Sequence, residues 1–255
     1  MKSFKPMLWA SLVALVVGTA GRAAPAESQK SSALNNDPHL VGWWKFDETT
    51  GKNAADSSGK NHHGTLEGGA SFDTLSTSGR IGGAIKFEGK DDCIRIAGWK
   101  GVCGQKARTI AAWIKASAPS GAIISWGTEE PGKMWTFGYV RGRIGVVPKG
   151  GYYYMKAETH DDTWHHVAVV LQEASPPNLH DHVKLFKDGE PAEVHDIGLL
   201  DLWPIDTGDK LDVVIGKRFK GLIDDLRVYD RVLSEDEINA LFKMQGDSQS
   251  NKNTK

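Results

Sequence analysis

Two adjacent acidic residues near the end of the chain are the first candidates for chemistry. Within residues 222–229, Asp224 shares its parity with Leu222 and Leu226. A strand here would turn Asp224 toward the core and Asp225 to the opposite face. Because a buried carboxylate is destabilising unless it is paired, hydrogen-bonded or metal-bound, we expect Asp224 to have a partner.

An oxygen-rich loop at residues 56–61 (Asp-Ser-Ser-Gly-Lys-Asn) suggests what that partner is. Calcium binds carboxylate, amide and backbone carbonyl oxygens, and Gly59 lets the backbone turn its carbonyls inward. A calcium ion is one partner for Asp224. The alternative is that Asp224 accepts hydrogen bonds from backbone N–H groups of this loop, without a metal.

Other residue types give weaker indications of chemistry. The pairs at 62–63 and 165–166 are adjacent histidines, which point to opposite faces of a strand, and no closed zinc ligand set surrounds them. The acidic pairs at 91–92 and 161–162 resemble turn residues. The chain has no Gly-x-Ser-x-Gly sequence and no phosphate-binding glycine loop. We therefore expect a protein that is not an enzyme.

Aromatic residues favour binding instead. We expect Trp44, Trp113 and Trp164 to fill the core, because they lie in strongly apolar segments. Alternation places Tyr152 and Tyr154 on one face of a strand and Tyr153 on the other. Exposed aromatic rings stack on sugars and anchor protein interfaces. The residues that we expect to be exposed for ligand binding are Trp99, Trp135, Tyr153 and Trp203.

The two cysteines, Cys93 and Cys103, are predicted to form a disulfide. Ile94 and Ile96 share one face of a strand, so Cys93 points off the core, beside the loop that carries Cys103. Two reduced thiols are the alternative.

Short apolar segments separated by turn residues predict the elements that position these side chains. A capping box at Ser234 and Glu237, followed by an apolar stripe, predicts one short helix near the end of the chain. The expected strands are residues 40–47, 84–88, 93–97, 109–115, 121–126, 135–140, 143–147, 152–157, 164–172, 183–187, 213–216 and 221–229.

The first residues have the order of a secretory signal peptide. Two lysines precede an apolar run at residues 7–20, and small residues follow, so cleavage is expected after Ala23 or Ala26. The run is short for a membrane span, although an uncleaved anchor is the alternative. We divide the chain into a signal peptide at 1–26, a flexible lead-in at 27–38, one domain at 39–245 and a disordered tail at 246–255. The protein is therefore expected to be secreted, to the periplasm or beyond the cell.

The charge of the chain excludes some partners. The formal net charge is −1. Removing residues 1–26 takes away Lys2, Lys5 and Arg22 and no acid, which leaves 28 basic and 32 acidic residues. A mildly acidic protein has no electrostatic attraction for nucleic acids or anionic membranes. Neither is expected as a partner, and no membrane span remains after signal removal.

Several segments, taken together and in order, resemble the LamG-like jelly-roll domains of the concanavalin A-like lectin/glucanase superfamily, which are common in exported bacterial proteins. The resemblance covers residues 40–242 and implies an all-β fold of two antiparallel sheets, with one short C-terminal helix. The segments that carry it are residues 42–48 (GWWKFDE), 55–66 (ADSSGKNHHGTL), 79–92 (GRIGGAIKFEGKDD), 109–115 (TIAAWIK), 164–168 (WHHVA) and 221–234 (GLIDDLRVYDRVLS).

The resemblance also implies a structural calcium ion that joins the first and last strands. By this analogy the ligands are Asp47, Asp56, Asn61 and Asp224. Two histidines stand where the family usually has a small polar pair after Asn61. The Glu-x-Asp-x-x-Glu pattern of the superfamily's glucanases is absent.

We therefore expect an exported, non-catalytic module at the cell envelope that binds a glycan or another exported protein. The alternatives are a polysaccharide hydrolase with unrecognised acids and a structural surface component.

Overall fold

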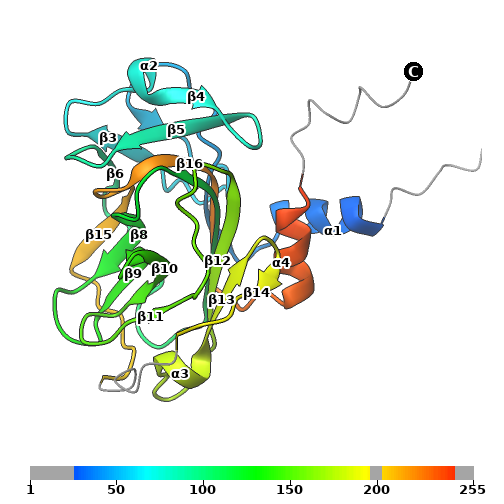
Figure 1. Ribbon diagram of the computed structural model, residues 1–255, viewed down its shortest axis with the longest axis vertical. Coiled ribbons are helices and arrows are strands. Elements are labelled where there is room, and N and C mark those ends of the chain that lie inside the picture. The colour runs from blue at the N-terminus through cyan, green and yellow to red at the C-terminus, as the bar shows by residue number, and fades with distance from the viewer. Residues whose placement is uncertain (1–25, 196–202, 245–255) are drawn as a thin grey trace, which may run out of the picture.

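Two antiparallel sheets face each other and enclose most of the apolar side chains (Figure 1). The structure is a computed structural model that describes residues 26–195 and 203–244. Residues 1–25 of the predicted signal peptide and the predicted tail at 246–255 lie outside the described residues. The predicted jelly-roll sandwich is confirmed, with eight strands in each sheet.

Sheet A has the long strand β16 near its centre. One edge of β16 pairs with β7, and the other pairs with β5 and, farther along, with β1. The strands of sheet A, with β1 joined to β16 outside the main order, are β14 (Glu190–Pro191), β13 (Val183–Lys187), β12 (His165–Leu171), β7 (Arg108–Ala116), β16 (Lys220–Tyr229), β5 (Gly83–Glu88), β4 (Ser76–Ser78) and β1 (Leu40–Trp44).

Sheet B packs against one face of sheet A. Its inward side chains alternate with outward ones, so that β9 places Trp135 and Phe137 in the core and Thr136 outside. The strands of sheet B, in spatial order, are β11 (Tyr153–Tyr154), β10 (Arg143–Val147), β9 (Met134–Val140), β8 (Ala122–Gly127), β15 (Leu211–Ile215), β6 (Cys93–Ile96), β3 (Gly64–Glu67) and β2 (Asn53–Ala54).

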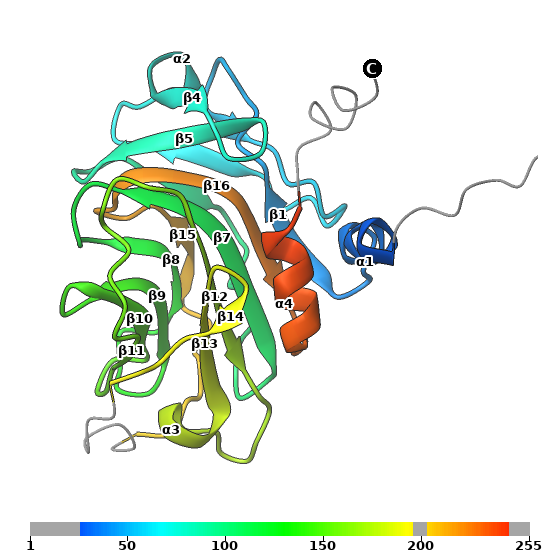
Figure 2. The same cartoon turned by 45° about the vertical axis from the view of Figure 1, so that its right-hand side comes forward.

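Helices cover the other face of sheet A. Figure 2 shows α4 (Glu235–Phe242) against the strands of this sheet, on the side away from β8–β11. A second apolar cluster lies between them and includes Ile238, Leu241 and Tyr229. The Ser234 side chain accepts a hydrogen bond from the Glu237 N–H, and the capping box predicted for this helix is confirmed.

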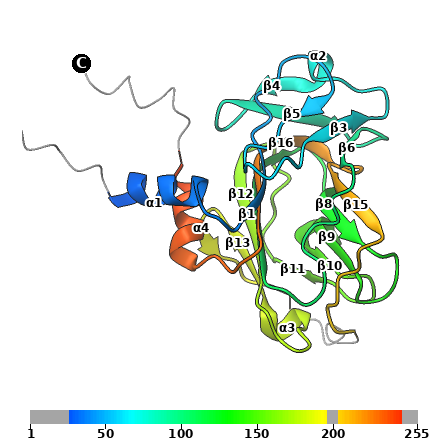
Figure 3. The same cartoon turned by 180° about the vertical axis from the view of Figure 1, so that it is seen from behind.

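Three further helices are present that the sequence did not predict. They are α1 (Ala26–Asn35), α2 (Phe72–Leu75) and α3 (Leu179–His182). The helix α1 occupies most of the segment that we expected to be a flexible lead-in. It lies beside α4, as seen from behind in Figure 3. Leu34 is buried in the second cluster and its carbonyl accepts a hydrogen bond from the Tyr229 hydroxyl, so one apolar residue anchors a polar segment.

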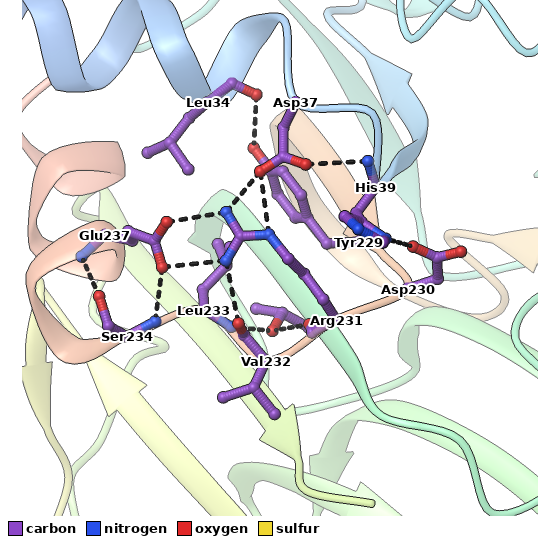
Figure 4. Close-up of polar contacts among 11 residues, drawn as sticks. Leu34, Asp37, His39, Tyr229, Asp230, Arg231, Val232, Leu233, Ser234 and Glu237 are labelled. Atoms are coloured by element: carbon purple, nitrogen blue, oxygen red, sulfur yellow. Dashed lines mark hydrogen bonds and ion pairs between the residues drawn. The ribbon is translucent and has the colours of Figure 1, made fainter.

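A single arginine ties the start of the domain to its end (Figure 4). The Arg231 Nε donates to Asp37 Oδ2 at 2.9 Å, and its Nη1 and Nη2 atoms lie 3.0 and 2.7 Å from the Glu237 carboxylate. Beside it, His39 Nδ1 lies 2.8 Å from Asp230 Oδ1. This clasp holds the residues before β1 against the start of α4.

Within residues 26–195 and 203–244, none of the helices has the length and apolar content needed to cross a bilayer.

Candidate functional site

The strand β16 changes the face of its side chains at Asp224. A shift in register against β7 follows Asp224, and Asp225 has a left-handed φ of 47°. Because of this bulge, Ile223 and Leu226 both point into the core, and Asp224 lies on the other face, opposite Trp113. The core-facing orientation predicted for Asp224 is therefore wrong, since strict alternation does not continue through a bulge.

Asp224 is nevertheless fully buried, beneath the loop at residues 79–83. Its Oδ2 accepts a hydrogen bond from the Ile81 N–H at 2.8 Å, but its Oδ1 finds no donor in the part of the chain that the structure describes. Burial raises the pKa of Asp224 to about 8, and the nearby Asp225 and Asp47 carboxylates act in the same direction. A buried carboxyl group with a free oxygen requires a proton or a cation.

Asp47 faces the same loop from the other side. Its Oδ1 accepts a hydrogen bond from the Gly83 N–H at 2.6 Å. Two of the four predicted calcium ligands, Asp47 and Asp224, are thus brought together around residues 79–83.

The other two predicted ligands lie in a separate loop. The Asp56 carboxylate accepts hydrogen bonds from the N–H groups of Trp43, Ser58 and His62 and from the Ser58 hydroxyl. These four donors match the four lone-pair directions of a carboxylate, so Asp56 has no acceptor capacity left for a metal. Asn61 is exposed in the same loop, with a left-handed φ of 61°.

A calcium site fits only the first half of the predicted ligand set. Among the described residues, no three His, Cys, Asp or Glu side chains are grouped closely enough to hold a metal ion. The unpaired Asp224 Oδ1 and the neighbouring Asp47 carboxylate suit a hard cation, whereas Asp56 organises its own loop. The hydrogen bonds expected between Asp224 and the Asp56 loop are replaced by one to Ile81.

The predicted disulfide is not formed in the structure, where both cysteines are free. The Cys93 Sγ lies 3.7 Å from Glu67 Oε2, at the beginning of β6. Cys103 follows the other end of that strand, and its Sγ lies 3.3 Å from the Lys100 carbonyl and 3.4 Å from the Gly208 carbonyl. The two thiols thus contact different segments of the chain.

Two of the four aromatic residues predicted for ligand binding belong to the core. Trp135 is 0 % exposed because it shares the inward parity of Phe137, packs against Trp126 and lies under the Arg108 guanidinium. Tyr153 is 8 % exposed and packs in the core. The expected exposure of these two residues is therefore wrong.

Trp99 is half-buried. Its ring stacks on the His62 imidazole, with the centroids 4.2 Å apart, and tilts against Trp44. The His62 Nδ1 lies 2.7 Å from the Val41 carbonyl, which fixes this imidazole beneath the indole. Trp99 therefore closes the edge of the core and presents only part of its ring to solvent.

Trp203 is 48 % exposed, more than the other large hydrophobic side chains of the described residues. One side of its indole rests on Gly150, where a Cβ atom would lie 2.5 Å from Cδ1. Gly150 has a φ of 107°, which also favours glycine. Pro131 adjoins Gly150, and Gly132 lies beside the Trp203 Cβ atom, so these residues border the floor. Hydrogen bonds from the Gly132 N–H to the Lys149 carbonyl and from the Asp206 N–H to the Gly132 carbonyl join the three loops. We call Trp203 and these three floor residues the Trp203 platform.

Charged side chains surround the platform. Lys149 Nζ lies 2.6 Å from Glu129 Oε2, and the hydrogen bond from Lys149 holds the pKa of Glu129 below its usual range. Lys133 and Lys210 both approach the Glu130 carboxylate. Leu211, a second exposed hydrophobic residue, follows Lys210 directly. A ring ligand on Trp203 would therefore find donors and acceptors at the rim.

Sequence reasoning found Trp203 but missed the residues that support it. A signal was available in the glycines of residues 131–132 and 149–151, which lie in turns between apolar strands. The sequence could not show that these two turns meet beneath one indole.

Comparisons with solved structures agree with the sandwich. Domain 4 of AbnA, a GH43 extracellular arabinanase from Geobacillus stearothermophilus, solved with arabinotriose, is similar at 20% identity with a TM-score of 0.60, over 80% of this chain and 98% of that one. The ligand-binding domain of botulinum neurotoxin serotype D, solved with N-acetylneuraminic acid, is similar at 16% identity with a TM-score of 0.54, over 84% of this chain and 52% of that one. The chain thus spans about half the length of the neurotoxin domain. No curated protein matches the sequence.

The fold is that of a lectin-like β-sandwich. The sequence profile described as the concanavalin A-like lectin/glucanases superfamily matches residues 88–239, more than half of the chain. The protein therefore belongs to this superfamily, as the resemblance implied.

Proposed function

We propose that this protein is an exported, non-catalytic module that binds carbohydrate, with the Trp203 platform as its principal contact. The observation that carries the proposal is the Trp203 indole, which is 48 % exposed and rests on glycine backbone. Such a flat, rigid face suits the C–H surface of a sugar ring, and the charged rim supplies hydrogen bonds to hydroxyl groups. The similar solved domains that hold an arabinotriose or a sialic acid support the same class of ligand.

Replacing Trp203 by alanine is expected to weaken saccharide binding at least about thirtyfold, the loss of an aromatic hot spot worth about 2 kcal/mol. Trp203→Phe keeps an aromatic face and is expected to retain most of the affinity. The measurement is a glycan array followed by titration calorimetry on the best saccharide. Val232→Ala is the matched control, because Val232 is also an exposed apolar residue but follows β16 beside the clasp.

The outcomes separate this proposal from its alternatives. Unchanged affinity in the Trp203→Ala protein would place the ligand elsewhere. Absence of binding across the array would favour a structural component of the cell surface. Release of reducing ends from a polysaccharide would identify a hydrolase instead.

We also propose that a calcium ion stabilises the sandwich, held by Asp47, Asp224 and backbone carbonyls around residues 79–83. The ion would neutralise the two carboxylates that approach this loop. It would not use Asp56, whose oxygens already accept four hydrogen bonds.

Removal of calcium by a chelator is therefore expected to lower the melting temperature by roughly 5 °C or more, since an ion at about 100 times its Kd stabilises by roughly 2.7 kcal/mol. Asp224→Asn removes the buried charge and should make the melting temperature insensitive to calcium. Asp56→Asn should remain sensitive, although it lowers stability. An unchanged melting temperature in the wild-type protein, with no calcium by elemental analysis, would reject the site.

A further inference from the structure

An exposed arginine lies on a strip of aromatic rings on the outer face of sheet B. Tyr154 lies opposite Gly145 of β10, on the face away from Tyr153, but its side chain is itself buried. The Tyr152 and Tyr154 rings are 5.9 Å apart, and the His195 ring is 4.9 Å from Tyr154. We call Tyr152, Tyr154 and His195 the tyrosine strip.

The guanidinium of Arg141 rests on this strip, 4.7 Å above the Tyr152 ring. No carboxylate of residues 26–195 or 203–244 forms an ion pair with it. The neighbouring cations differ, because Arg143 pairs with Glu158 and Lys156 pairs with Glu193. An arginine stacked on a ring keeps its planar N–H edge free, which is the arrangement that binds a carboxylate or a sulfate in a bidentate manner.

The backbone conformation at Arg141 is consistent with this interpretation. Val140 of β9 pairs with Arg143 of β10, so Arg141 and Gly142 form a two-residue hairpin turn. Both have positive φ, 49° and 80°. Such a turn favours Asn-Gly, and an arginine at its first position is strained. Arg218 also has a positive φ, so the strain at Arg141 points to a ligand only together with the guanidinium that lies on the Tyr152 ring.

We propose that Arg141 and the tyrosine strip recognise the anionic group of an acidic polysaccharide. This inference rests on the carbohydrate binding proposed above. The partly exposed Tyr152 ring contacts the sugar, the buried Tyr154 ring packs behind it, and the Arg141 guanidinium binds the carboxylate or sulfate. The strip begins two residues after Gly150, the glycine beneath Trp203. A bound polysaccharide would therefore pass from one aromatic surface to the other.

The experiment compares polysaccharides that differ only in charge. Affinity of the purified protein is measured for polygalacturonate and its methyl ester, and for κ-carrageenan and its desulfated form. We expect at least tenfold tighter binding to the anionic member of one pair, which also distinguishes a carboxylate from a sulfate. Arg141→Asn should reduce that affinity to the level of the neutral member. Because asparagine suits the turn, this variant should fold and melt no lower than the wild-type protein.

Arg218 provides a matched control. It is also exposed with a positive φ, 57°, but it lies in the turn between β15 and β16 and contacts no aromatic ring of the described chain. Arg218→Asn therefore makes the same change of charge and of backbone strain, and the preference for the anionic member should persist. Arg141→Lys keeps the charge but loses the planar fork, and should show an intermediate preference.

Equal affinity for the charged and neutral members of both pairs would overturn this inference. So would a preference that survives in Arg141→Asn. If neutral glycans bind in a Trp203-dependent manner while both pairs show no preference, the proposed function stands and only the role of Arg141 fails. Absence of binding to every glycan would overturn both proposals.

Discussion

Replacing Asp225 by alanine is expected to lower the free energy of unfolding by about 3–5 kcal/mol, the largest effect of a single substitution outside the apolar core. Asp225 and Arg227 form a buried ion pair, with Nε–Oδ2 at 3.0 Å and side chains that are 7 % and 3 % exposed. Trp43 Nε1 also donates to Asp225 Oδ1 at 2.5 Å. Without Asp225, the Arg227 guanidinium would stay buried on the Trp43 ring, with the neutral Asn35 and Tyr229 side chains as polar partners and no counter-charge.

Equilibrium unfolding in urea measures this loss. Glu88→Ala serves as the control, because Glu88 pairs with Lys86 at the surface, where solvent screens the pair and leaves it little effect on stability. The double variant Asp225→Ala, Arg227→Met removes both charges and should recover much of the stability. If the single variant loses no more than Glu88→Ala, the pair does not carry the stability assigned to it.

Neutral His166 is expected to contribute stability that is lost in acid. This contribution is read from the difference between the wild-type protein and His166→Met, because protonation of Asp224, whose pKa burial raises to about 8, acts in the opposite direction in both proteins. His166 lies beneath α4, in edge contact with Trp113, and its Nδ1 has no hydrogen-bond partner among the described residues. Burial lowers its pKa to about 3, and the Arg227 charge acts in the same direction. The unfolded chain therefore binds a proton near the ordinary histidine value of 6.5, whereas the folded chain does not.

The stability that depends on neutral His166 is complete above pH 6.5 and falls as the pH drops toward about 3. Between pH 7.5 and pH 4.5 this contribution to the free energy of unfolding falls by about 2–3 kcal/mol, because pH 4.5 lies roughly two pH units below the pKa of histidine in the unfolded chain. Urea titrations of the wild-type protein and of His166→Met at both pH values isolate this contribution. A difference between the two proteins that does not change with pH would show that His166 does not titrate on unfolding.

Strand positions could be predicted closely because the apolar segments are short and bounded by turn residues. The range 143–147 agrees with β10, and 183–187 agrees with β13. Alternation also placed Tyr152 and Tyr154 correctly on the face opposite Tyr153. These features depend on neighbours in the sequence, so a periodicity argument reaches them.

The errors arise where a distant segment decides the outcome. Periodicity could not show the bulge after Asp224, which occurs where β16 changes partner from β5 to β1. Likewise, α1 has too few apolar residues to signal a helix, and it is held by Arg227 and Tyr229 from the other end of the chain. Trp135 is a different case, because it lies on the same face of β9 as Phe137. An assignment of Phe137 to the core would have placed Trp135 there too.

The candidate site was predicted only in part for the same reason. Trp203 could be identified as an exposed ring, but its floor comes from two turns that are distant in the sequence. Arg141 was overlooked, although Arg-Gly between two apolar strands is an unusual hairpin turn and could have been noticed. What the sequence does not contain is the contact between Arg141 and a tyrosine on another strand.

The position of β16 has a consequence for when the domain can fold. Its neighbours β1, β5 and β7 all precede it, and the contact between Asn35 and Arg227 spans 192 residues. Sheet A therefore stays open while the chain is being synthesised, and contacts of such sequence separation form slowly. A nascent chain that lacks its final strand cannot complete sheet A. The same topology that joins the two ends of the domain would delay its folding until the last strand has been synthesised.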